Sequence, residues 1–109
     1  MKVKELLFVA DLSSIAMPCP DREVCGAYVG DLLSWVMGRA KEDDAWITIM
    51  SNSNIVAVAT LADVSCIILA EGVTPDAGVV DTAMAKGINL LSSNASAYEI
   101  AKKLSVLGL

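Results

Sequence analysis

Histidine is absent from the 109-residue sequence. Its absence excludes imidazole metal ligands, serine triads and imidazole general acid–base catalysis. Aromatic residues are scarce as well, at 5% of the chain. The core must therefore be built from Ala, Val, Ile and Leu, which favours thin, closely packed layers of helix and sheet.

Basic residues are in the minority, with eight Lys and Arg against thirteen Asp and Glu. A nucleic-acid binder needs a cationic stripe to displace phosphate counterions, so we expect no nucleic-acid partner. A membrane-spanning helix needs about 20 apolar residues, whereas the best run, Ile55–Ala62, ends at Asp63. Asp11 also interrupts the apolar segment near the start too early for a secretory signal. We expect no membrane contact and a cytoplasmic location.

The cysteines are three in number, widely spaced and without a Cys-x-x-Cys motif. This pattern disfavours a zinc or iron–sulfur site within one chain, so we expect no metal and no cofactor. Cys25 and Cys66 lie in apolar runs, which predicts that both are buried. Cys19 stands between two prolines and is expected to be more exposed.

The chain is 55% hydrophobic and 19% charged, the reverse of a disordered composition. Its length suits one domain spanning residues 1–109. Strands are expected at 23–29, 45–50, 65–70 and 88–91. Helices are expected at 3–11, 32–37, 55–62, 77–86 and 97–107, and Leu12–Met17 is left as a short apolar piece.

Polar residues stand before several of the expected helices. Asp31, Thr74 and Ser96 are predicted to be helix caps, with Pro75 at a first helical position and Gly87 just past a helix end. Strand, polar turn and helix recur along the chain, which indicates parallel strands joined by right-handed crossovers. We therefore predict an α/β fold with a mainly parallel sheet of about four or five strands flanked by helices.

Ligands of open parallel sheets bind outside the carboxyl ends of the strands. Those ends would bring together polar turn residues, and the candidates for ligand binding among them are Asp31, Ser51, Asn52, Asn54, Gly72 and Thr74, near the turn 92–94. Their N–H groups and side chains suit a small polar or anionic ligand. The same residue types also serve simply as helix caps, so both interpretations stay open.

Three further candidates each allow two interpretations. Asp21 and Arg22 form either an ion pair that faces a ligand or partner, or a turn followed by a solvated arginine. Gly26 permits close backbone approach of a ligand or marks crowded packing in a strand. Trp35 faces either a second subunit or the core.

The stretch from Asp21 to Ser34 (DREVCGAYVGDLLS) resembles the DRTGG domain family, whose pattern is Asp-Arg, two residues, Thr-Gly-Gly, a hydrophobic strand and Asp-Leu-Leu-Ser. Trp46–Ile49, Asn54–Ala59 and the Gly72–Pro75 loop also fit, so the similarity covers the chain from about Leu6 onward. The sequence departs from the pattern where Cys25-Gly26-Ala27 replaces Thr-Gly-Gly.

The resemblance implies an α/β fold like that of the amino-terminal domain of HPr kinase, and a regulatory or ligand-binding role. Family members stand alone, adjoin CBS domains or lie inside phosphate acetyltransferases, and stand-alone copies are often encoded near hydrogenase or redox genes. We therefore predict a non-catalytic regulatory module that binds a small polar or anionic ligand, such as a nucleotide, and forms a homodimer. The alternative is an interaction or dimerisation module without a ligand, associated with a kinase or a redox system.

Overall fold

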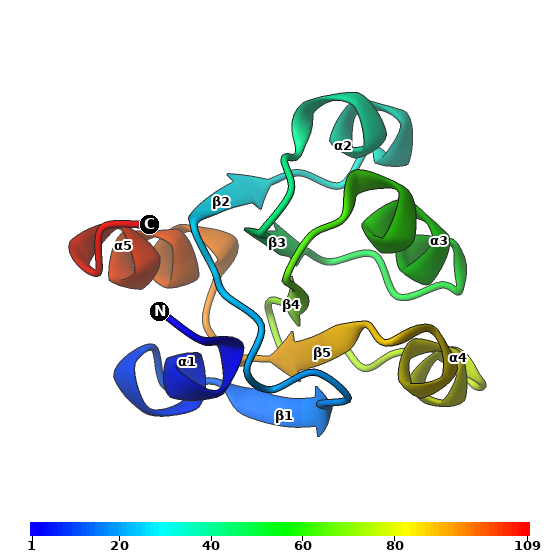
Figure 1. Cartoon of the computed structure of the whole chain (residues 1–109), viewed down its shortest axis with the longest axis horizontal. Helices are drawn as coiled ribbons and strands as arrows, with labels where there is room; N and C mark the ends of the chain where they lie inside the picture. The colour runs from blue at the N-terminus through cyan, green and yellow to red at the C-terminus, as the bar shows by residue number, and fades with distance from the viewer.

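One five-stranded sheet forms the centre of the computed structural model, which describes all 109 residues (Figure 1). The strands are β1 (Ser13–Ala16), β2 (Gly26–Val29), β3 (Asp44–Thr48), β4 (Cys66–Leu69) and β5 (Asn89–Ser92). They lie in the order β1-β5-β4-β3-β2. Strands β2 to β5 are parallel, and β1 pairs antiparallel with β5. The predicted α/β fold with a mainly parallel sheet is confirmed.

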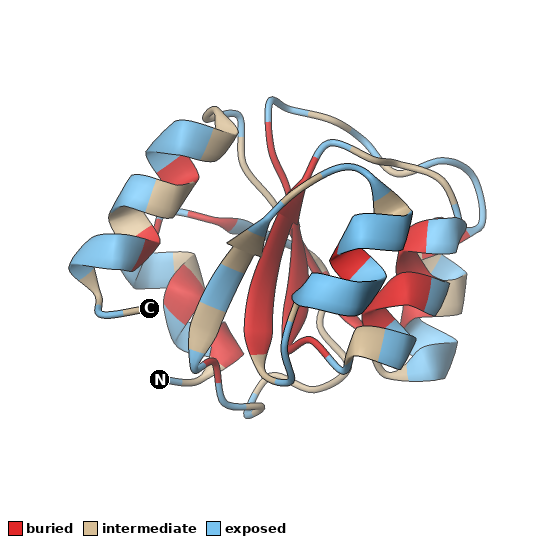
Figure 2. Cartoon of the chain, turned by 90° about the horizontal axis from the view of Figure 1, so that it is seen from above, coloured by how far each residue is buried: buried red, intermediate tan, exposed pale blue.

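Helices cover both faces of this sheet. They are α1 (Val3–Val9), α2 (Leu33–Arg39), α3 (Asn54–Ala62), α4 (Val79–Lys86) and α5 (Ala97–Val106). Helices α2, α3 and α4 join successive parallel strands and pack side by side on one face, while α1 and α5 lie on the other (Figure 1). Figure 2 shows the buried strands between the two helical layers. None of the helices is long and apolar enough to cross a lipid bilayer.

The central strands are buried on both sides. In β3, Trp46 packs toward α2, α3 and α4, whereas Ala45 and Ile47 pack toward α1 and α5. The same alternation holds in β4, where Ile67 and Ile68 belong to opposite cores. Successive strand side chains point to opposite faces, so a strand covered on both faces needs an unbroken apolar run. This is why β3 and β4 carry the clearest strand signals in the sequence.

Asn89 is the fully buried polar residue that fastens the segment between β1 and β2 to the sheet. Its Nδ2 donates to the carbonyl oxygens of Cys19 (2.7 Å) and Ser65 (3.0 Å), and its Oδ1 accepts from the Cys19 N–H (2.9 Å). The Ser65 hydroxyl donates to the carbonyl of Glu23 in the same segment. The chain from Cys19 to Glu23 is thereby held across the amino ends of β4 and β5.

One strand was not predicted, and two predicted helix caps are wrong. The piece Leu12–Met17 contains strand β1, which pairs antiparallel with β5. This pairing lies outside the alternation of strand and helix from which the other strands were predicted. Helix α4 begins at Val79, directly after Gly78. Thr74 and Pro75 lie in the irregular loop before Gly78, so neither residue caps the helix. Asp31 does not cap α2, because its carboxylate bonds to the end of β3.

Other predicted boundaries are confirmed. The Ser96 hydroxyl accepts from the N–H of Glu99 at the start of α5. Gly87 follows α4 with a left-handed φ of 73°. Both are local signals, since a cap needs only a side chain and an N–H a few residues away.

The cysteines are all free thiols in different surroundings. Cys66 is buried, as predicted, and Cys19 is half-buried with its Sγ donating to the Gly87 carbonyl (3.5 Å). The prediction that Cys25 is buried is wrong. It precedes β2, an edge strand on which alternate side chains face solvent.

Replacing Asn89 by Leu should lower the free energy of unfolding by about 2–3 kcal/mol, because it leaves the Cys19 amide and the Ser65 carbonyl without partners. Urea denaturation measures the loss. The matched control is Asn54→Leu at an exposed position, which should leave the midpoint almost unchanged. An equal effect of both substitutions would contradict the proposed fastening role of Asn89.

Iodoacetamide at pH 8 should modify Cys25 in the folded chain and leave Cys66 unmodified until the chain unfolds. The thiolate is the reactive form, and burial raises the pKa of the Cys66 thiol to about 12. Mass spectrometry of the alkylated chain, with and without urea, identifies the modified residues. Rapid labelling of Cys66 without denaturant would show that the core around Cys66 is accessible to the reagent in the folded chain.

Candidate functional site

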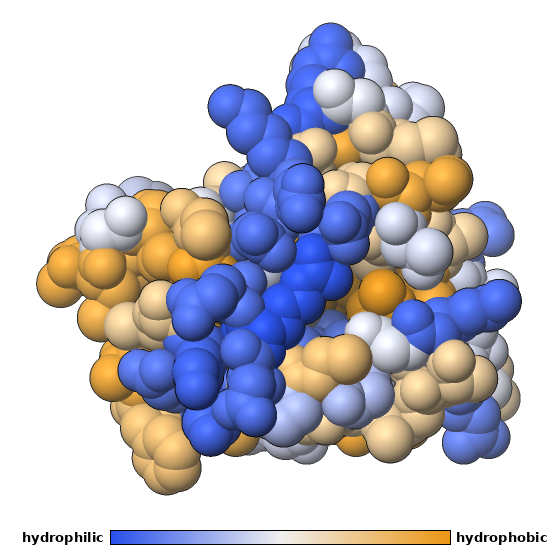
Figure 3. Space-filling view, viewed as in Figure 1, coloured by the Kyte–Doolittle hydropathy of each residue, from blue (hydrophilic) through white to orange (hydrophobic).

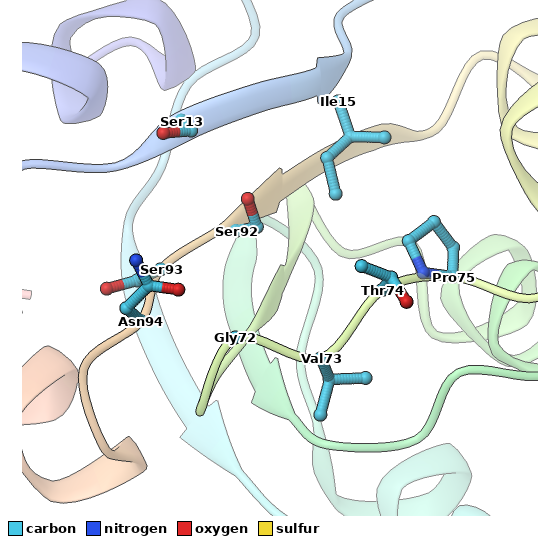
Figure 4. Close-up of a pocket in the computed structure, with 9 residues that line it drawn as sticks. All are labelled: Ser13, Ile15, Gly72, Val73, Thr74, Pro75, Ser92, Ser93 and Asn94. Atoms are coloured by element: carbon cyan, nitrogen blue, oxygen red, sulfur yellow. The ribbon is translucent and has the colours of Figure 1, made fainter.

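A pocket of about 390 Å³ lies beside the carboxyl ends of β4 and β5, where β1 pairs with β5 (Figure 4). Three segments supply its walls: β1, the loop after β4, and the end of β5 with the turn that follows. The lining residues are Ser13, Ile15, Gly72, Val73, Thr74, Pro75, Ser92, Ser93 and Asn94. The pocket thus stands at the edge of the sheet where parallel α/β folds bind ligands.

The loop after β4 is tied to the turn after β5. The N–H groups of Glu71 and Gly72 donate to the carbonyls of Ala95 (2.8 Å) and Ser93 (2.9 Å). Glu71 and Gly72 both have left-handed backbones, with φ of 61° and 69°. A Cβ on Gly72 would also lie 2.9 Å from Asn94 Oδ1, and the left-handed backbone at this position favours glycine.

Four polar side chains around the pocket form no hydrogen bond with the rest of the protein, namely those of Ser13, Thr74, Ser92 and Asn94. Ser93 differs, since its hydroxyl accepts from the N–H of Ala95 (3.0 Å) and so stabilises the turn. The four free groups offer three hydroxyls and one amide to a ligand. None of the lining residues is charged.

Of the predicted site residues, Gly72 and Thr74 line the pocket, and four others lie at the same end without lining it: Asp31, Ser51, Asn52 and Asn54. The Ser51 hydroxyl donates to Asp76 (2.9 Å), and Asn52 Oδ1 accepts from the N–H of Asn54 (2.9 Å). Ser51 therefore joins the loops after β3 and β4, while Asn52 shapes the turn before α3. Their hydrogen bonds serve the chain itself.

Asp31 joins the segment after β2 to the end of β3. Its Oδ1 accepts from the Thr48 hydroxyl (2.8 Å) and from the Ile49 N–H (2.9 Å). The carboxylate is thus engaged by the protein and does not line the pocket. Asp31 positions the carboxyl ends of two neighbouring strands.

Arg22 lies at the opposite end of the sheet from the pocket. Its guanidinium contacts the carboxylates of Asp43 (3.1 Å) and Asp63 (2.9 Å), which stand just before β3 and just after α3. Both aspartates have left-handed backbones, with φ of 67° and 58°. Arg22 therefore holds two strained turns together and is not simply a solvated arginine.

Asp21 and Gly26 belong to the same end of the molecule. Lys4 Nζ lies 2.8 Å from the Asp21 carboxylate and holds the pKa of Asp21 below its ordinary value. A Cβ on Gly26 would lie 2.7 Å from Asp44 Oδ1, so the glycine marks crowded packing. Figure 3 shows a continuous hydrophilic band across this face of the molecule. The structure thus separates Asp21, Arg22 and Gly26 from Gly72 and Thr74.

Sequence reasoning missed Ser13 and Ile15 as pocket residues. They belong to β1, which has two consecutive serines and no clear alternation. Their contribution depends on the antiparallel pairing of β1 with β5, a contact between segments about 75 residues apart. No local pattern in the sequence indicates that pairing.

The structure has no group of three or more His, Cys, Asp or Glu side chains placed to hold a metal ion. The sequence allowed two positions for Trp35, in the core or facing a second subunit, and the structure shows it 54% exposed. Arg39 stacks on its ring with the guanidinium carbon 3.9 Å from the ring centre. The interpretation of Trp35 as a core residue is therefore excluded.

A structural comparison finds the same fold in the crystal structure of the CBS and DRTGG domains of the regulatory region of Clostridium perfringens pyrophosphatase, complexed with the activator diadenosine tetraphosphate. The TM-score is 0.73 at 15% sequence identity, and the match covers 94% of this chain. The chain spans 45% of that longer chain. No curated protein sequence matches this chain.

The profile of the DRTGG domain matches residues 24–107. This range includes every parallel strand and all helices except α1. The resemblance seen in the sequence is confirmed, and the chain belongs to the DRTGG domain family.

Proposed function

We propose that the chain is a non-catalytic regulatory module that binds a small polar ligand in the pocket between β1, β5 and the loop after β4. The observation that carries this proposal is the set of four unused polar side chains of Ser13, Thr74, Ser92 and Asn94. The DRTGG domain of the structural neighbour belongs to a regulatory region that was crystallised with a nucleotide activator, which supports such a role.

The chemistry of the pocket favours binding over catalysis. Its lining contains no acid, base or thiol that would transfer a proton or attack a substrate. The lining comes from three chain segments. A ligand that contacts all three would hold the antiparallel edge strand β1 against the parallel part of the sheet. The three free thiols support a reducing compartment such as the cytoplasm.

We expect at least one of adenosine, ATP, diadenosine tetraphosphate or acetyl phosphate to raise the Tm of the chain at millimolar concentration. A ligand at ten times its Kd stabilises the folded state by about 1.4 kcal/mol. In a domain of this size that corresponds to about 5 °C or more. Differential scanning fluorimetry measures the shift.

Two variants locate the binding site. Ser92→Leu places an apolar side chain in the pocket and should abolish the shift, whereas Arg22→Gln at the opposite end should retain it. Circular dichroism checks that both variants are folded. If Arg22→Gln lost the Tm shift and Ser92→Leu kept it, the ligand would bind at the end of the sheet that carries Arg22 and not in the pocket. If no compound raised the Tm of the parent chain, the proposed function would be refuted.

A second observation favours self-association, with or without a ligand. Exposed apolar side chains gather at the corner where β2 and β3 end: Val29, Leu32, Trp35 and Ile49. Val29 pairs in register with Ile47, and the Ile49 N–H binds Asp31, next to Leu32. We propose that this corner, with the unpaired edge of β2, contacts a second copy of the chain. A two-fold interface would then cover both apolar corners at once.

The Leu32→Glu and Trp35→Glu variants should be monomers in sedimentation velocity at micromolar concentration, where the parent chain sediments as a dimer. Burying a carboxylate in the interface is costly because it loses its hydration. The control, Leu61→Glu, changes an equally exposed leucine on α3 and should stay dimeric. A parent chain that is monomeric throughout this range would exclude the homodimer.

A further inference from the structure

The pocket between β1 and β5 lacks cationic groups. No Lys or Arg lines it, and the charged residues nearest in sequence to its lining are the acids Asp11, Glu71 and Asp76. From this, and on the basis of the function proposed above, we infer that the ligand is uncharged and of the nucleoside type, with hydroxyl groups on one part and a flat apolar face on the other. The polar or anionic ligand expected from the sequence is thereby narrowed to an uncharged one.

A phosphate group would find few partners here. Proteins bind phosphate with Lys or Arg side chains, or with several free backbone N–H groups. In this loop the N–H groups of Glu71, Gly72 and Val73 already donate to the carbonyls of Ala95, Ser93 and Ala70. Of residues 71–75, only Thr74 keeps an N–H without an acceptor in the chain, because Pro75 has no N–H.

The turn after β5 likewise offers one backbone donor, the N–H of Asn94, which has no acceptor in the chain. The Ser93 N–H donates to the Leu69 carbonyl, and the Ala95 N–H donates to the Ser93 hydroxyl. The free backbone donors are thus the single N–H groups of Thr74 and Asn94, which belong to opposite sides of the pocket (Figure 4). A phosphate dianion placed here would exchange its hydration for neutral donors alone, with no Lys or Arg beside it.

The free groups match an uncharged ligand instead. Hydroxyls of Ser13 and Ser92 and the amide of Asn94 lie on one side of the pocket, and each both donates and accepts hydrogen bonds. Ile15 and Pro75 lie on the other side (Figure 4). Sugar hydroxyls would bond to the first group while a base packs against the second. A volume of about 390 Å³ is sufficient for a small ligand of this kind.

Isothermal titration calorimetry with adenosine, AMP and ATP tests the inference. Adenosine is the uncharged portion of the activator that was crystallised with the structural neighbour. We expect adenosine to bind most tightly and AMP to bind at least about tenfold more weakly, with ATP weaker still.

A charge-introducing variant tests the physical reason. Thr74 is exposed and its side chain has no hydrogen-bond partner, so Thr74→Lys adds a cation to the pocket at little structural cost. It should increase AMP affinity relative to adenosine by about tenfold, whereas the uncharged control Thr74→Gln should not change the ratio.

The outcomes separate the inference from the function on which it rests. Tighter binding of AMP or ATP than of adenosine to the parent chain, lost in Ser92→Leu, would overturn the inference and leave the ligand-binding function intact. Failure of adenosine to bind would also overturn the inference. Failure of all three compounds, together with the absence of a thermal shift with any tested compound, would remove the ligand-binding function as well.

Discussion

The backbone ladder of β3, β4 and β5, covered by apolar side chains on both faces, is the constraint on which the rest of the structure depends. Each of these strands is paired on both sides and packed against helices above and below. A strand in this position has no place for an unpaired polar group. Polar chemistry can therefore gather only at the two ends of the sheet, where the strands give way to loops.

The two ends use their polar residues in opposite ways. At the amino ends of the strands, Arg22 and Asn89 are satisfied by partners within the chain, and their bonds fix the turns that enter the sheet. At the carboxyl ends, backbone bonds between the loops after β4 and β5 fix the loop positions, which leaves Ser13, Ser92 and Asn94 unused. Groups whose positions are fixed and whose hydrogen bonds are free suit ligand binding.

This division gives the residues that identify the family a structural role in this chain. Arg22 bridges two left-handed aspartates, and Gly26 makes room for the Asp44 carboxylate, which accepts from the Lys41 N–H (2.8 Å). The replacement of the pattern's Thr by Cys25 falls on an exposed position before the edge strand. A change there leaves the contacts of Arg22 and Gly26 in place.

The sequence allowed prediction of what is local or periodic. Continuous apolar runs predicted β3 and β4, and the Ser96 cap predicted the start of α5. Pairings between segments that are far apart in the sequence could not be predicted from it. Asp31 was predicted to be a helix cap because it stands just before α2. Its carboxylate instead accepts from Thr48 at the end of β3, a partner that no local pattern indicates. Ser13 and Ile15 were missed as pocket residues for the same reason, since β1 reaches the pocket only through its antiparallel pairing with β5.

The pocket at the carboxyl ends is tested most directly by a titration of the ¹⁵N-labelled chain with adenosine, followed through the backbone amide signals. We expect saturable shifts at Gly72, Thr74, Ser92 and Asn94, with the signals of Arg22 and Gly26 unchanged. Shifts confined to the end that carries Arg22, or no shifts at millimolar adenosine, would contradict the assignment of this pocket as the ligand site.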